Sequence, residues 1–130
     1  MSYIEDAVFN CQAQRIGHGW QIIDGCQYKN DTYIPNSKIA QYVLDKQIPL
    51  EICISSNVKS GASSVTIENH PAIKLLKSGF KVTLNSDNRL MAKTKISEEF
   101  KKAENYLELD GNLHSQLVKN AIDARFTNLK

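Results

Sequence analysis

Three short apolar segments recur along the chain, and each runs into a polar or glycine-containing corner. The segments are residues 14–18, which end at Gly19, residues 48–54, which end at Ser55 to Asn57, and residues 80–85, which end at Ser86 to Asn88. Their starts lie about 34 and 32 residues apart, close to the length of one strand–helix–strand unit. This spacing predicts three strands, and Pro49 is compatible with the second because it stands near that strand's beginning.

Stretches with helical periodicity occupy the rest of the chain. Ser37 is suited to cap a helix that continues through Lys46, because a hydroxyl oxygen accepts from the free N–H groups of a first turn. Pro71 fits the first position of another helix, which Gly79 ends. The predicted helices cover residues 2–12, 37–46, 71–79, 97–107 and 113–126.

Strands that alternate with helices at this spacing predict a parallel sheet in an α/β fold. In such sheets, functional sites form at the edge where the carboxyl ends of the strands meet. The residues at those ends are His18, then Ser55 to Asn57, and then Asp87 and Asn88. Three separate strands therefore deliver polar side chains to one edge, and we expect the functional site there.

His18 and Asp87 have the widest chemical use among these residues. The imidazole of His18 can act as a general base, a charge-stabilising donor or a metal ligand; the alternative is a half-buried histidine with a backbone partner. Asp87 can ligate a hard or borderline cation; the alternative is a carboxylate that caps the following turn. Asn88 has both a donor and an acceptor, which suits recognition of a heterocycle edge.

Other candidate residues have structural interpretations. Cys53 lies within an apolar strand and is expected to be a small core residue. His70 precedes a proline and is expected at a helix N-terminus, whereas His114 is expected to be exposed on the last helix. The charges between residues 98 and 104, Glu99 among them, predict a solvated helix face.

Composition narrows the class of protein. The chain of 130 residues is 42% apolar and 23% charged, as in one globular domain. Its net charge of +2 comes from interleaved basic and acidic residues, so we expect no nucleic-acid partner. No apolar run approaches the ~20 residues that span a bilayer, so we expect no membrane partner. The three cysteines form no CxxC pair and no secretory leader is recognisable, which predicts reduced thiols and a cytoplasmic location.

Three motifs occur in order along the sequence. They are Arg15-Ile16-Gly17-His18-Gly19, then Glu51-Ile52-Cys53-Ile54-Ser55-Ser56-Asn57, and then Asn85-Ser86-Asp87-Asn88. With His70-Pro71 between them, they resemble the last third of the adenosine deaminase family, a branch of the metal-dependent amidohydrolase barrels, over residues 3 to about 126. The resemblance implies that residues 1–130 form a single partial domain. Its strands would be the sixth, seventh and eighth of a TIM (β/α)₈ barrel.

The resemblance also implies roles for individual residues. His18 matches the catalytic histidine that orients and stabilises a zinc-bound hydroxide, and Asp87 matches an aspartate that ligates zinc. Asn88 stands where many members have a second aspartate facing the purine ring, so we expect it to bind substrate. The implied reaction is hydrolytic deamination of a purine nucleoside, adenosine to inosine. Adenine deaminase is the nearest alternative within the enzyme class.

Several parts of the family pattern are missing from this sequence. They are a His-x-His pair after the first strand, a histidine after the fifth, and a His-Ala-Gly-Glu segment whose glutamate protonates the purine. One carboxylate does not replace them, because a zinc site needs several protein ligands. Three strands of a closed barrel also leave two open edges.

Two hypotheses follow from these missing parts. In the first, the chain is a deaminase part, inactive alone, and a second polypeptide carrying strands one to five completes its zinc site. In the second, it is a non-catalytic remnant or interaction module that self-associates through its open edges.

Overall fold

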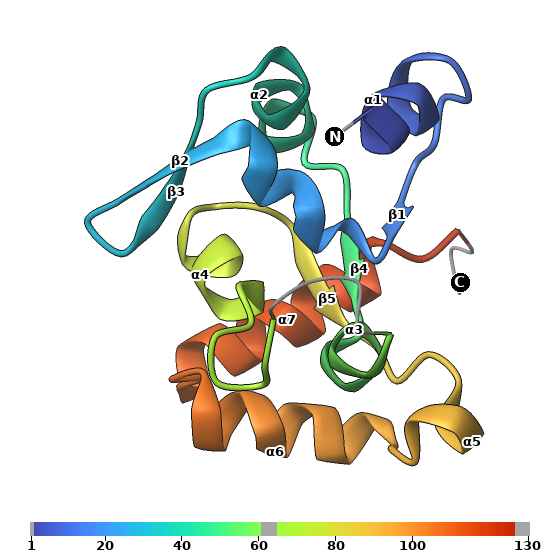
Figure 1. Ribbon diagram of the computed structural model, residues 1–130, viewed down its shortest axis with the longest axis vertical. Helices are drawn as coiled ribbons and strands as arrows, with labels where there is room; N and C mark the ends of the chain where they lie inside the picture. Colours follow the sequence, from blue (N-terminus) through green and yellow to red (C-terminus); the bar gives the residue numbers. More distant parts are fainter. Residues whose placement is uncertain (1, 61–64, 127–130) are drawn as a thin grey trace.

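The computed structural model describes residues 2–60 and 65–126, which form a parallel sheet surrounded by helices, with a hairpin that projects from one side (Figure 1). The strands of the sheet are β1 (Ile16–Gly17), β4 (Leu50–Ile52) and β5 (Val82–Leu84), in the order β1-β4-β5. Ile16 lies opposite Leu50, and Leu50 lies opposite Val82, with both pairs of strands parallel. The predicted parallel strands and the α/β class are confirmed.

Helices occupy all five predicted regions. Their bounds are α1 (Ser2–Phe9), α2 (Lys38–Asp45), α4 (Ala72–Lys77), α6 (Ile96–Tyr106) and α7 (Gly111–Asp123). Ser37 caps α2 as predicted, since its hydroxyl oxygen accepts from Ala40 N at 3.2 Å. Asp110 caps α7 by accepting from Leu113 N at 2.8 Å. That cap explains why α7 begins at Gly111, two residues before its predicted start.

The structure contains further elements that the sequence pattern did not predict. They are the 3-10 helix η1 (Gly19–Gly25), the antiparallel hairpin strands β2 (Cys26–Lys29) and β3 (Thr32–Pro35), and the short helices α3 (Ile54–Lys59) and α5 (Arg89–Ala92). The hairpin turns at Asn30 and Asp31, whose φ angles are 51° and 60°, as a two-residue type I′ turn requires. Helix α3 replaces the polar corner that was expected at the end of β4.

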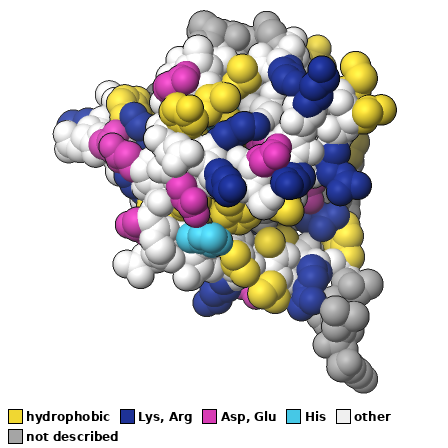
Figure 2. All heavy atoms as spheres, turned by 90° about the horizontal axis from the view of Figure 1, so that it is seen from below, with side chains coloured by type: hydrophobic (Ala, Val, Ile, Leu, Met, Phe, Trp, Pro, Cys, Tyr) yellow, Lys and Arg dark blue, Asp and Glu magenta, His cyan; other side chains and the backbone are white. Residues whose placement is uncertain are grey.

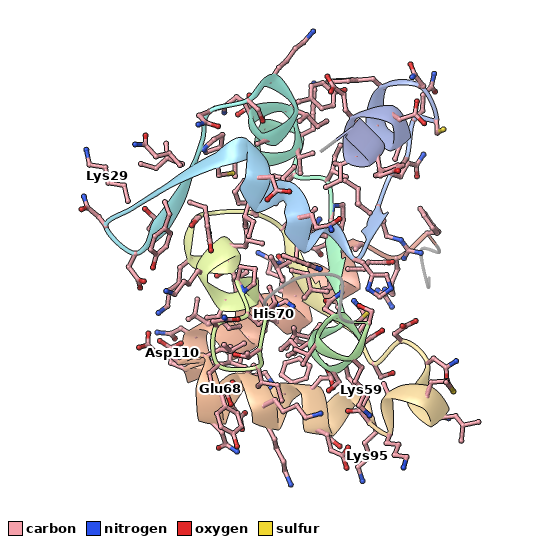
Figure 3. The ribbon with its side chains drawn as sticks, in the orientation of Figure 1. Lys29, Lys59, Glu68, His70, Lys95 and Asp110 are labelled. Carbon is pink, nitrogen blue, oxygen red and sulfur yellow. The ribbon has the colours of Figure 1, made fainter. Side chains whose placement is uncertain are left out.

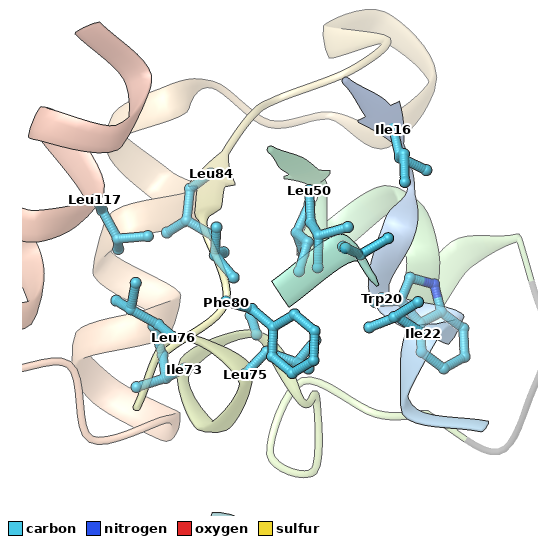
Figure 4. Close-up of a cluster of buried hydrophobic side chains, with 14 of the residues drawn as sticks. Ile16, Trp20, Ile22, Leu50, Ile73, Leu75, Leu76, Phe80, Leu84 and Leu117 are labelled. Atoms are coloured by element: carbon cyan, nitrogen blue, oxygen red, sulfur yellow. The ribbon is translucent and has the colours of Figure 1, made fainter. Parts of the chain in front are cut away.

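The hydrophobic core lies between the sheet, η1 and α4 (Figure 4). Leu50 and Ile52 are fully buried because β4 is the central strand. Phe80 is the largest fully buried side chain, and Trp20 of η1 is 6% exposed. Cys53 is buried as predicted, and burial raises the pKa of its thiol to about 12.

The surface shown in Figure 2 carries basic, acidic and apolar side chains interspersed on one face. Across residues 2–60 and 65–126, no helix combines the length and apolar character that crossing a membrane requires.

The predicted solvent exposure of Glu99 is wrong. Glu99 is completely buried, where its carboxylate accepts from Ser55 N at 3.0 Å and Thr94 Oγ1 at 2.7 Å and pairs with Lys102 Nζ at 3.3 Å. Burial raises the pKa of this carboxyl, but the hydrogen bonds from Ser55 and Thr94 and the charge of Lys102 outweigh it and hold the pKa below its ordinary value. Glu99 therefore joins α6 to the first turn of α3.

We predict that Gly19→Ala lowers the free energy of unfolding by about 1–3 kcal/mol, the usual cost of overpacking. A Cβ at Gly19 would lie 2.7 Å from Cδ2 of Leu50, which is fully buried, and 3.2 Å from Cγ2 of Ile16. Gly17→Ala is the matched control, because a Cβ there meets nothing within 4 Å. It should change stability by no more than about 0.5 kcal/mol. Urea unfolding followed by circular dichroism measures both, and equal stabilities would contradict this packing.

Candidate active site

His18 and Asp87 meet at the edge of the sheet where the strands end. His18 follows β1 directly, and its backbone N–H donates to Glu51 O at 2.8 Å, which extends the β1–β4 pairing by one residue. Asp87 follows β5, and its Oδ2 lies 3.7 Å from Nε2 of His18. The structure therefore brings together two of the predicted site residues from two non-adjacent strands.

Both residues have left-handed backbone conformations. The φ angle is 53° for His18 and 52° for Asp87, a region that few residues with a Cβ occupy, although histidine and aspartate tolerate it better than most. Such conformations persist where the surrounding structure holds them, and they cluster at functional sites. The side chains remain accessible, with 46% of His18 and 39% of Asp87 exposed, so a ligand can reach both.

Helix α3 fixes the position of the Asp87 carboxylate. Ser56 Oγ donates to Asp87 Oδ2 at 2.6 Å. This hydrogen bond is the main reason that the pKa of Asp87 lies below its ordinary value, and the backbone N–H of Asn88 and the nearby His18 lower it further. Asp87 is therefore ionised at neutral pH, as a metal ligand must be.

Asn57, the next residue of α3, joins three parts of the site through its amide. The amide oxygen accepts from His18 Nδ1 at 3.0 Å and from Trp20 Nε1 at 3.2 Å. The amide nitrogen donates to Cys53 O at 2.8 Å and faces His70 Nε2 at 3.3 Å. The opposite orientation would set the amide oxygen against a carbonyl oxygen, with no proton between the two acceptors.

His70 lies deep in the molecule, beside the start of α4 (Figure 3). Its Nδ1 accepts from Ala72 N at 3.2 Å, in the first turn of that helix. This contact confirms the predicted role of His70 at a helix N-terminus. Burial lowers the pKa of His70 to about 4, so its ring is neutral at neutral pH.

Asn88 caps the short helix α5, because its Oδ1 accepts from Met91 N at 3.0 Å. The capping role that the sequence left open for Asp87 is therefore taken by its neighbour. Since the oxygen of Asn88 is engaged in this cap, a contact with substrate would use its amide nitrogen.

A cavity of about 500 Å³ opens beside Asp87. It is lined by Ser56, Lys59, Ser60, Asp87, Asn88, Met91 and Ala92. Lys59 Nζ donates to Ala92 O at 2.6 Å, which ties α3 to α5 across this cavity. The cavity gives a small molecule a path to the carboxylate.

Asp87 and His18 are the two candidate metal ligands at this edge of the sheet. In the part of the chain that the structure describes, no three His, Cys, Asp or Glu side chains converge as a metal-binding group. Asp87 offers a carboxylate oxygen and His18 offers Nε2 beside it, whereas a zinc ion needs several protein ligands. These residues do not hold a metal by themselves.

We predict that His70 makes stability depend on pH. Its pKa is about 4 in the folded chain and 6.5 as an ordinary value, so between these pH values only the unfolded chain binds the proton, and stability falls as pH falls from 6.5 to 4. The loss would reach about 3 kcal/mol, and His70→Gln should remove it. His114→Gln, on the half-exposed side of α7, is the control and should retain it. Urea unfolding across this pH range measures the slopes; equal slopes in wild type and His70→Gln would refute the assignment.

Comparisons with known proteins place this site in a family. The sequence model described as adenosine deaminase matches residues 1–130. The chain is 44% identical over 96 residues to an adenosine deaminase of Mycobacterium marinum, covering 74% of this chain and 26% of the relative. It is 47% identical over 90 residues to adenosine deaminase 1 of Streptomyces coelicolor, covering 69% and 22%. The chain thus matches about a quarter of the length of these relatives.

Two solved structures resemble the fold over nearly the whole chain. An adenine deaminase from Arthrobacter aurescens superimposes with a TM-score of 0.83 at 26% identity, covering 98% of this chain and 36% of that one. An N6-methyl-AMP deaminase from Arabidopsis thaliana superimposes with a TM-score of 0.72 at 26% identity, covering 98% and 34%. The predicted partial (β/α)₈ barrel is confirmed by these similarities. The chain belongs to the adenosine deaminase family, and it forms the C-terminal portion of that family's barrel.

Proposed function

We propose that this chain supplies one part of a zinc-dependent deaminase that hydrolyses adenosine to inosine. The observation that carries the proposal is the approach of His18 Nε2 to Asp87 Oδ2, 3.7 Å apart at the carboxyl edge of the sheet. The remaining zinc ligands and the glutamate that protonates the purine would come from sequence outside residues 1–130. The match to only about a quarter of each adenosine deaminase relative supports that division.

Each site residue has a task that its surroundings support. Asp87 would hold one coordination position, and zinc, when bound, would supply Lewis-acid activation of the attacking water. His18 would hold or accept a proton at Nε2, since a general base must lie within reach of the group that loses the proton. Asn88 would direct its amide nitrogen to the heterocycle.

Adenosine is the substrate that the comparisons favour. The sequence relatives that are 44% and 47% identical carry the name adenosine deaminase. The two solved structures, at 26% identity, are an adenine deaminase and an N6-methyl-AMP deaminase. All of these names denote deaminases of adenine or of a compound that contains the adenine ring.

The exposed apolar surface beside β5 supports the need for further barrel sequence. A groove of about 340 Å³ lies between β5, α6 and α7 and is lined almost wholly by apolar side chains, among them Leu84, Phe100 and Ile122. Apolar patches of this kind mark interaction surfaces, and β5 is the last strand in the sheet order. We propose that the rest of a deaminase barrel covers this groove. Self-association of a non-catalytic chain through the same surface is the second candidate.

The proposal predicts that activity appears on mixing. The purified chain would be combined with the N-terminal portion of the Mycobacterium marinum relative and with zinc, and the loss of adenosine absorbance would be followed. We expect zinc-dependent deamination in the mixture and none with either portion alone. His18→Ala and Asp87→Ala should each lower the rate by about 10²- to 10⁴-fold, whereas Lys29→Ala, on the hairpin away from the site, should not.

A folded, associated mixture without activity would contradict the proposal. The second candidate would be favoured by an oligomer of this chain alone whose size, measured by gel filtration, is indifferent to chelators and to Asp87→Ala.

Substitution of Ser56 tests whether Asp87 acts as a zinc ligand that is held in place by a hydrogen bond. Ser56→Ala removes the hydroxyl that donates to Asp87, and loss of such a partner of a metal ligand typically costs about 10- to 100-fold in metal affinity or activity. Ser60→Ala is the matched control, because Ser60 lies one turn further along and its hydroxyl donates to Asn57 O. Zinc titration of the mixture measures both variants. Equal zinc affinities would show that the hydroxyl of Ser56 does not support the ligand.

A further inference from the structure

We propose that Asn57 is the positioning residue that fixes the tautomer of His18, with the proton on Nδ1 and the free electron pair on Nε2. The inference rests on the proposed function for its chemical meaning, because Nε2 is the nitrogen that faces Asp87. Its test requires neither zinc nor activity.

Two hydrogen-bonding partners whose donor or acceptor role is fixed set the orientation of the Asn57 amide. Cys53 O can only accept a hydrogen bond, and Trp20 Nε1 can only donate one. They lie 2.8 Å and 3.2 Å from the two ends of the amide, so the nitrogen faces the carbonyl and the oxygen faces the indole. Asn57 is 6% exposed, which leaves water little opportunity to replace either partner.

The same orientation places the amide oxygen 3.0 Å from Nδ1 of His18. An amide oxygen can only accept, so Nδ1 of His18 must carry the proton of this hydrogen bond. A neutral imidazole has one N–H, and Nε2 is therefore left as an acceptor. The assignment follows from hydrogen-bonding partners, which is how a histidine tautomer is inferred.

His70 competes for the same amide but does not reverse its orientation. Its Nε2 lies 3.3 Å from Asn57, and its Nδ1 accepts from Ala72 N at 3.2 Å. A neutral ring that accepts at Nδ1 carries its proton on Nε2, which would favour the opposite amide orientation. That gain is one long contact, whereas reversal would replace the 2.8 Å and 3.2 Å bonds to Cys53 and Trp20 with two repulsive contacts.

With this tautomer, the two atoms that face each other in the site are both hydrogen-bond acceptors. Nε2 of His18 and Oδ2 of Asp87, 3.7 Å apart, are then both acceptors, at a separation too long for a direct hydrogen bond. A proton donor or a cation placed between them is attracted to both atoms. His18 is thus prepared to take a proton from a bound molecule and not to give one.

The test is a long-range ¹H–¹⁵N spectrum of the chain with ¹⁵N-labelled histidine, recorded at a pH where the rings are neutral. We expect His18 to carry its proton on Nδ1 in the wild type. In Asn57→Leu, which keeps the branched shape of the side chain but has a larger volume and no acceptor, the carboxylate of Asp87 should draw the proton to Nε2. Asn57→Asp, which retains an oxygen towards His18, should restore the Nδ1–H form.

The internal control is His114, which contacts Glu104 and Phe100 and should give the same spectrum in every variant. A proton on Nε2 of His18 in the wild type would overturn the inference even if neither variant folds. An unchanged Nδ1–H form in a folded Asn57→Leu would also overturn it. Either result leaves the mixing experiment untouched, so failure of this inference is distinguishable from failure of the proposed function.

Discussion

Ser55, Ser56 and Asn57 follow one another on the first turn of α3, and each binds a different part of the fold. Ser55 donates from its backbone N–H to Glu99 on α6, Ser56 donates to Asp87 after β5, and the amide of Asn57 holds His18 after β1. Because successive residues of a helix point in different directions, one short turn can hold three segments that lie far apart in the sequence. The geometry of the candidate site depends on this turn.

The position of this first turn of α3 depends on the buried carboxylate of Glu99. An ionised carboxylate inside a protein is tolerated only where hydrogen bonds and an opposite charge compensate the loss of water. Glu99 has both, from Ser55, Thr94 and Lys102, and it accepts from an N–H at the start of α3 that has no partner within the helix. Buried Glu99, paired with the partly exposed Lys102, therefore helps to fix the position of α3 and, through α3, the positions of His18 and Asp87.

The sequence predicts the strands, which follow from local periodicity, and the site residues that stand directly after the strands. The three strands lie within the segments 14–18, 48–54 and 80–85, which were predicted from their regular spacing. His18 and Asp87 follow from the rule that sites form where parallel strands end. The hairpin had a local signal as well, because Asn30-Asp31 is a pair suited to a type I′ turn. The regular spacing of strands and helices does not by itself indicate an additional hairpin between β1 and α2.

Other features depend on contacts that sequence periodicity does not show. Helix α3 has six residues, too few for a 3.6-residue period to emerge, and its serines and asparagine are typical of a turn. Glu99 is flanked by charges and looks like a solvated residue, yet α6 turns it towards Ser55 and Thr94. The role of Asn57 depends on contacts with His18, Trp20 and His70, which lie far from it in the sequence.

As proposed above, Asp87 holds one position of a zinc site, His18 lies beside it, and the remaining ligands come from sequence outside residues 1–130. The most direct measurement is the zinc content of the complex between this chain and the N-terminal portion of a relative, isolated by gel filtration. This arrangement predicts about one zinc ion per complex for the wild-type chain and a large loss of zinc with Asp87→Ala. A complex that retains its zinc after Asp87→Ala would contradict it.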